Sequence, residues 1–164
     1  MDKPRISHYE NLTGTLYIES NAFRTMLIDG SNVIRKMYIP NKSGIDLDKE
    51  SVLECVLYSY LRENLILRYY NKILLFFDGP QRSFNTQLSN DIFIVFSKSN
   101  KADSLILAYL ARIRHIPFES KYIQLVTEDR ELIQQSKSII RSICIIRTIR
   151  FLKALNSLET AEKP

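Results

Sequence analysis

Residues 25–30, TMLIDG, form a compact apolar run that ends on an aspartate followed by a glycine. Two later stretches also end an apolar run on an aspartate: residues 74–78, LLFFD, and residues 125–129, LVTED. Short apolar runs bounded by turn residues are typical of strands that are buried on both faces of a parallel sheet. Ligands bind beyond the carboxyl ends of such strands, so the pattern predicts three aspartates at one edge of a sheet.

The remaining residues alternate between helical and extended patterns. Apolar periodicity predicts helices over 48–69, 101–115, 130–136 and 148–158, and strands over 25–29, 72–78, 92–96, 122–127 and 143–146. Strands that alternate with helices indicate an α/β protein with a mostly parallel five-stranded sheet, arranged as a Rossmann-like three-layer α/β/α sandwich. We expect one domain over 25–158, a C-terminal tail over 159–164, and an N-terminal extension over 1–24 in which residues 16–18 favour a short edge strand.

The composition is that of a soluble globular protein. The chain has 164 residues, of which 45% are hydrophobic and 25% charged, enough for one core but not for two ordinary domains. No apolar run approaches the roughly 20 residues of a membrane span, and residues 1–5 lack the apolar region of a secretory signal. We therefore expect an intracellular, cytoplasmic protein with no membrane partner. Cys55 and Cys144 both lie in apolar patterns, which favours free thiols.

Four aspartates are candidates for one catalytic metal site: Asp29, Asp78, Asp103 and Asp129. Each has an ordinary structural interpretation, since Asp-Gly pairs form turns, Asp103 lies in the first turn of a helix, and Asp129 precedes another helix. Together at one edge, however, their carboxylates would repel one another unless a divalent cation with oxygen ligands lay between them. Two such cations can activate water and stabilise a leaving oxygen. Glu128 is either a further ligand or a solvated neighbour.

Polar and basic residues near these aspartates are candidates for substrate binding. Ser31 and Asn32 can hydrogen-bond a phosphate, although Asn32 is equally suited to cap a helix over 33–38. The net charge is +5, and cations beside a carboxylate cluster are suited to a polyanionic substrate. The candidate phosphate-binding residues are Arg82, Lys98 and Lys101, with a second basic group at Arg141, Arg147, Arg150 and Lys153. For each one, solvated surface is the alternative.

Residues 28–33, IDGSNV, resemble the DGxN signature of the NYN domains, the branch of PIN-like ribonucleases that includes the bacterial YacP-like family. The resemblance continues in order through residues 76–80, 102–106 and 126–132, and it spans residues 25–150. It implies a PIN-like sandwich, an acidic cluster that binds Mg²⁺ or Mn²⁺, and endonucleolytic cleavage of RNA. By position, the site would consist of Asp29, Asn32, Asp78, Asp103 and Asp129.

Two positions depart from the family pattern and bear on catalytic strength. YacP-like proteins often carry two adjacent acidic residues in the third motif, where Asp103 is followed by Ser104, and a small polar residue where Glu128 stands. The leading hypothesis is a metal-dependent endoribonuclease acting on single-stranded RNA. The alternative is a catalytically weak PIN-like module that binds RNA or a protein partner in the ribosome or an RNA-processing assembly.

Two other classes of enzyme are disfavoured. A haloacid-dehalogenase-like phosphatase needs a second aspartate two residues after the first, and Ser31 stands there. A dinucleotide site needs a glycine-rich fingerprint after the first strand, where this chain has only Gly30.

Overall fold

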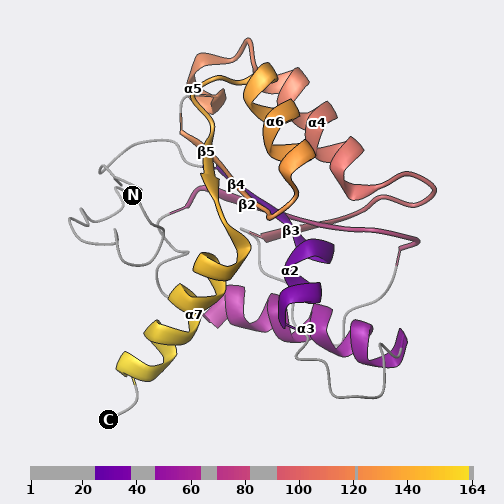
Figure 1. The fold of residues 1–164 in the computed structure, drawn as a ribbon, viewed down its shortest axis with the longest axis vertical. Helices are drawn as coiled ribbons and strands as arrows, with labels where there is room; N and C mark the ends of the chain where they lie inside the picture. Colours follow the sequence, from indigo (N-terminus) through magenta and orange to yellow (C-terminus); the bar gives the residue numbers. More distant parts are fainter. Residues whose placement is uncertain (1–24, 38–46, 64–69, 82–91, 121, 163–164) are drawn as a thin grey trace.

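The computed structural model describes residues 25–37, 47–63, 70–81, 92–120 and 122–162 (Figure 1). The expected N-terminal extension, with its edge strand at 16–18, lies outside the described residues, and so does Arg82. Within the described ranges, no helix is long and apolar enough to cross a membrane.

A five-stranded parallel sheet forms the middle layer, in the order β3-β2-β1-β4-β5. Its strands are β1 (Thr25–Asp29), β2 (Lys72–Phe77), β3 (Ile92–Phe96), β4 (Ile123–Val126) and β5 (Cys144–Ile146). Strand β1 is central, and in register with its neighbours Ile28 lies beside Leu75 of β2 and Val126 of β4. The predicted parallel α/β sheet is therefore confirmed.

Helices cover both faces of this sheet, as Figure 1 shows. Helices α4 and α6 pack against each other on one face, and α2, α3 and α7 lie on the other. Their bounds are α2 (Gly30–Met37), α3 (Leu47–Glu63), α4 (Ala102–Ile113), α6 (Arg130–Ile139) and α7 (Thr148–Glu162), with a short α5 (Pro117–Ser120) after α4. Helix α7 thus runs past residue 158, where the sequence predicted that this helix would end.

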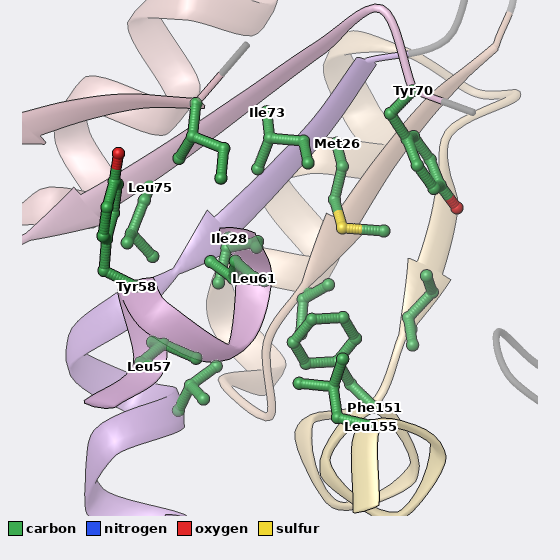
Figure 2. Close-up of a cluster of buried hydrophobic side chains, with 14 of the residues drawn as sticks. Met26, Ile28, Leu57, Tyr58, Leu61, Tyr70, Ile73, Leu75, Phe151 and Leu155 are labelled. Carbon is green, nitrogen blue, oxygen red and sulfur yellow. The ribbon is translucent and has the colours of Figure 1, made fainter. Parts of the chain in front are cut away.

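Every residue of β1 is buried, because successive side chains enter opposite layers. Met26 and Ile28 pack with Leu57 of α3 and Phe151 of α7 (Figure 2), whereas Leu27 joins the cluster beneath α4 and α6. A strand buried on both faces has a fixed register. The position of Asp29 at its end is fixed with it.

Helix α2 begins at Gly30, three residues before the helix over 33–38 that was one of the two interpretations of Asn32. A Cβ atom on Gly30 would lie 2.6 Å from Cε1 of Phe77 and 2.7 Å from the backbone oxygen of Phe76. The glycine therefore lets α2 start against β2 with no intervening loop, so Asn32 lies inside the helix and not at its cap.

The sequence analysis did not predict α5. Proline is suited to the first position of a helix, where its missing N–H has no partner to lose; Pro117 accordingly begins α5. Cys55 and Cys144 are free thiols, as expected, and both are half-buried.

Candidate functional site

Asp29 is the last residue of β1, and it is only 7% exposed. The hydroxyl of Thr127 donates a hydrogen bond to its Oδ2 at 3.0 Å, and the backbone N–H of Asn32 bonds to the carboxylate as well. Burial nevertheless raises the pKa of Asp29 to about 6, and the negative charges of Asp78 and Asp129 act in the same direction. This carboxylate is therefore short of positive charge.

Asp78 directly follows β2 and connects three elements. Its Oδ1 accepts the backbone N–H of Ala102 at 2.7 Å, so it caps α4, whose own N-cap residue Lys101 provides no capping hydrogen bond from its side chain. Its backbone N–H donates to Oγ of Ser31 at 2.8 Å. Nη2 of Arg35 lies 3.8 Å from its Oδ2. Asp78 thus caps α4, and its negative charge acts on Asp29.

Asp129 is the N-cap of α6, which is the ordinary interpretation that the sequence also allowed. Its Oδ1 accepts the backbone N–H groups of Glu131 and Leu132 at 3.0 and 3.1 Å. The hydroxyl of Thr127 accepts the N–H of Asp129 at 3.1 Å while it donates to Asp29. Thr127 therefore links two of the candidate aspartates, a role that the sequence did not indicate because it depends on β1 and β4 lying side by side.

Asp103 lies at the same edge of the sheet, at the start of α4. It is half-buried in the first turn of α4, where its Oδ1 accepts the N–H of Ser104 at 2.8 Å. It follows Ala102, the residue that Asp78 binds. The charges that act on Asp29 are those of Asp78 and Asp129, so the structure brings three of the four aspartates into electrostatic contact and leaves Asp103 at their border.

The three aspartates do not form a closed metal cage. Within the described part of the chain, no group of three or more His, Cys, Asp or Glu side chains is placed to hold a metal ion. Mg²⁺, however, is commonly held by one or two carboxylates, with water and substrate phosphates completing its shell. Carboxylate donors around a buried Asp29 with a raised pKa fit that second kind of site.

Glu128 is engaged elsewhere. Its Oε2 accepts Nε and Nη2 of Arg147 at 2.8 and 2.7 Å, and its Oε1 accepts the N–H of Ile149 at 3.2 Å. Partial burial alone would raise the pKa of Glu128, but the hydrogen bonds from Ile149 and Arg147 and the charges of Arg147 and Lys36 lower it below its ordinary value. Glu128 thus anchors the start of α7, and we leave it out of the metal site proposed below.

Of the other predicted binding residues, Asn32, Lys98 and Lys101 lie at the same edge of the sheet. Oδ1 of Asn32 accepts the N–H of Glu128 and the hydroxyl of Thr148, each at 2.9 Å, so Asn32 fastens α2 to the ends of β4 and β5. Lys98 and Lys101 are exposed in the loop between β3 and α4. The N–H of Lys98 donates to the oxygen of Gly79 at 2.7 Å, which ties this loop to the turn after Asp78. Contact with substrate stays a prediction for all of them.

The fold is similar to that of Rae1 (YacP) from Bacillus subtilis in two solved structures. One has a TM-score of 0.62 and covers 77% of the Rae1 chain; the other, of a single-residue mutant, has a TM-score of 0.60 and covers 79%. Both are 17% identical in sequence and cover 85% of this chain. No family model and no curated protein matches the sequence. The comparison supports a YacP-like fold.

Proposed function

We propose that this protein is a metal-dependent endoribonuclease that hydrolyses phosphodiester bonds of single-stranded RNA. The observation that carries the proposal is Asp29, a buried carboxylate at the end of the central strand whose pKa is raised by burial and by the charges of Asp78 and Asp129. Carboxylates with strongly shifted pKa values are found mainly at functional sites. The resemblance of the four aspartate motifs to the NYN domains supplies the reaction and the substrate.

Asp29, together with Asp78 or Asp129, would hold Mg²⁺ or Mn²⁺, with water and substrate phosphates as the remaining ligands and Asp103 near the site. When bound, the cation supplies Lewis-acid polarisation of the phosphodiester and lowers the pKa of water. Thr127 and the N–H of Asn32 keep the Asp29 carboxylate in one orientation. That fixed geometry reduces the entropy lost when substrate and cation are brought together.

Basic residues at the same edge would bind the phosphates on either side of the scissile bond. Lys98 and Lys101 lie beside the turn that follows Asp78, and Arg35, which the sequence did not single out as a site residue, lies next to the Asp78 carboxylate. Arg35 has a side chain that is 63% exposed, so it can reach a ligand. Replacing Lys98 and Lys101 together should weaken RNA binding with little effect on cleavage at saturating RNA.

The test is cleavage of a fluorescently labelled single-stranded RNA with Mn²⁺, comparing the wild type with Asp29→Asn. Glu131→Gln is the matched control, because it removes one negative charge as Asp29→Asn does. Glu131 is an exposed side chain in the first turn of α6. Products from the wild type and the control but not from Asp29→Asn support the proposal. Cleavage by Asp29→Asn at the wild-type rate overturns it.

One observation favours a second candidate, an RNA-binding module without strong catalysis. Asp78 and Asp129 each use a carboxylate oxygen to cap a helix, and such contacts do not require a metal. In the same assay, this function predicts that the wild type binds the RNA tightly in EDTA and yields no additional product when Mn²⁺ is added.

A further inference from the structure

Two aromatic rings and two cations meet on the α4 side of the sheet, near the amino ends of β2 and β3. Nζ of Lys72 lies 5.7 Å from the ring centroid of Phe93 and 5.6 Å from that of Tyr109. Cζ of Arg112 lies 5.2 Å from the same Tyr109 ring. We call these four residues the aromatic–cation cluster. The sequence analysis did not identify it, because its members come from three different elements.

The aromatic–cation cluster is open to solvent and keeps its positive charge. Phe93 is 47% exposed, which is unusual for a large apolar side chain in a sheet, and Arg112 is exposed as well. In the part of the chain that the structure describes, neither Lys72 nor Arg112 forms an ion pair with a carboxylate. An aromatic ring attracts a cation but has no net charge, so neither positive charge is neutralised. An exposed ring beside two cations favours an anionic ligand that has flat groups to stack.

Two elements lead from the acidic edge to this cluster. Helix α4 begins at Ala102, whose backbone N–H donates to Asp78, and Tyr109 lies two helical turns further along, a rise of about 10 Å. Strand β3 ends at the same edge, and Phe93 precedes its last residue by three positions, again about 10 Å. The helix and the strand therefore both place the cluster on the order of 10 Å from the edge that carries Asp78.

The exposed face of α4 forms a path between these two places. Residues three or four positions apart lie on one face of a helix, and this spacing connects Lys101, Ser104, Ala108 and Arg112, all of which are exposed. The two middle residues are small and uncharged, so neither a bulky nor an acidic side chain separates the two cations along this line. Asp103, the acidic residue of α4, is half-buried beside its start. The face is suited to a single-stranded polyanion.

We propose that single-stranded RNA follows α4 from the acidic edge to the aromatic–cation cluster. There one base stacks on the exposed Phe93 ring, and the charges of Lys72 and Arg112 attract the adjacent phosphates. The choice of RNA rests on the proposed function, but binding at the cluster needs neither metal nor cleavage. The subsite holds the strand on one side of the scissile bond and so sets which bond lies at the acidic edge.

The first experiment detects the stacked base directly. The chain has no tryptophan, so Phe93→Trp introduces a single fluorophore and keeps an aromatic ring at the cluster. Short single-stranded RNA, added in EDTA, should quench the emission of this variant by stacking. Val52→Trp is the control, because Val52 is 60% exposed on α3 in the opposite layer. Equal quenching of the two variants, or quenching of Phe93→Trp by polyglutamate as strongly as by RNA, overturns the proposal.

The second experiment measures RNA affinity in EDTA by fluorescence anisotropy over a range of salt concentrations. Phe93→Leu should weaken binding by about 5- to 100-fold, the usual effect of losing one stacked base. The Lys72→Gln, Arg112→Gln double variant should also bind less tightly, and its slope of log affinity against log salt should fall by about 0.7 for each lost phosphate contact.

The matched control for the double variant is Arg150→Gln with Lys153→Gln, which removes two exposed cations from α7 on the other face of the sheet. Circular dichroism establishes that all variants are folded. A cluster double variant with the affinity and slope of this control overturns the proposal.

The outcomes separate this inference from the proposed function. If Asp29→Asn cleaves RNA at the wild-type rate while RNA still quenches Phe93→Trp, the proposed function fails and binding at the cluster stands. If the wild type cleaves RNA but the folded cluster variants bind it with unchanged affinity, the subsite is excluded and the proposed function is unaffected.

Discussion

Asp29 and Glu128 are acidic side chains at the same edge of the sheet, and their environments move their pKa values in opposite directions. Asp29 is buried among like charges, and its pKa rises to about 6. Glu128, though also withdrawn from solvent, has Arg147 and the start of α7 beside it, and its pKa falls. The presence of a cationic partner, more than burial, distinguishes a carboxylate that holds the fold together from one that is left to meet a ligand.

The comparison also explains how ionisation of each side chain affects the stability of the folded protein. Glu128 gains a guanidinium and a backbone N–H within hydrogen-bonding distance, so ionisation strengthens the fold. Asp29 gains a hydroxyl and a backbone N–H, but these do not offset burial and repulsion. A bound cation would offset the burial and the repulsion at Asp29. At Glu128, where Arg147 already supplies the positive charge, it would add no stability.

The largest expected effect is on catalysis. Asp29→Asn should reduce RNA cleavage by more than about 100-fold, because replacing even the outer partners of a metal site typically costs 10–100-fold. Glu128→Gln should retain most of the activity, since it leaves the carboxylates of Asp29, Asp78 and Asp129 unchanged. Initial rates at saturating RNA and Mn²⁺ measure both. Equal losses of activity in the two variants would mean that Asp29 and Glu128 do not differ in their roles in catalysis.

The next effect is on the pH dependence of stability. The folded pKa of Asp29 is raised from 3.8 to about 6, so its contribution to stability is present below pH 4 and is lost as pH rises through 6. Two pKa units correspond to roughly 3 kcal/mol. In EDTA, Asp29→Asn should therefore be more stable than wild type at pH 8, by up to about 2 kcal/mol after weakened hydrogen bonds. Urea unfolding from pH 4 to 8 measures the difference, which should vanish at the acidic end.

Glu128→Gln should have the opposite sign. The lowered pKa of Glu128 means that its contribution is present above the unfolded pKa and is lost as pH falls through the folded value. At pH 7 the variant should lose about 1.5–3 kcal/mol, the scale of a hydrogen bond to a charged group. At low pH, where the wild-type carboxyl is protonated, the two proteins should unfold at more similar urea concentrations. A variant as stable as wild type at pH 7 would contradict the structural role of Glu128.

The smallest effect is that of metal on stability. A cation present at ten times its dissociation constant adds about 1.4 kcal/mol to the free energy of unfolding. Millimolar Mn²⁺ should therefore raise the Tm of the wild type and of Glu128→Gln, and leave that of Asp29→Asn unchanged. The increase should be larger at pH 7.5 than at pH 5, because protons compete for Asp29. Equal shifts in all three proteins would indicate nonspecific binding.

Local sequence patterns predicted those features of the structure that depend on residues close together in the chain. The strands and Asp129 as a helix cap were evident, because apolar runs and capping act over a few positions. The start of α2 at Gly30 was not predicted, since it depends on the close approach of Gly30 to Phe77 of another strand. The link between Asp78 and α4 and that between Glu128 and Arg147 join residues 24 and 19 positions apart. Contacts of this kind are decided by the sheet order, which periodicity does not contain.

The order of the strands has a consequence for synthesis of the protein. Strand β4 lies beside β1, yet it follows β2 and β3 along the chain. A nascent chain that has reached β3 therefore has one open edge of β1 and lacks both Thr127 and Asp129. The acidic edge is completed only after synthesis has passed residue 129, so a translation product that ends before β4 lacks Asp129.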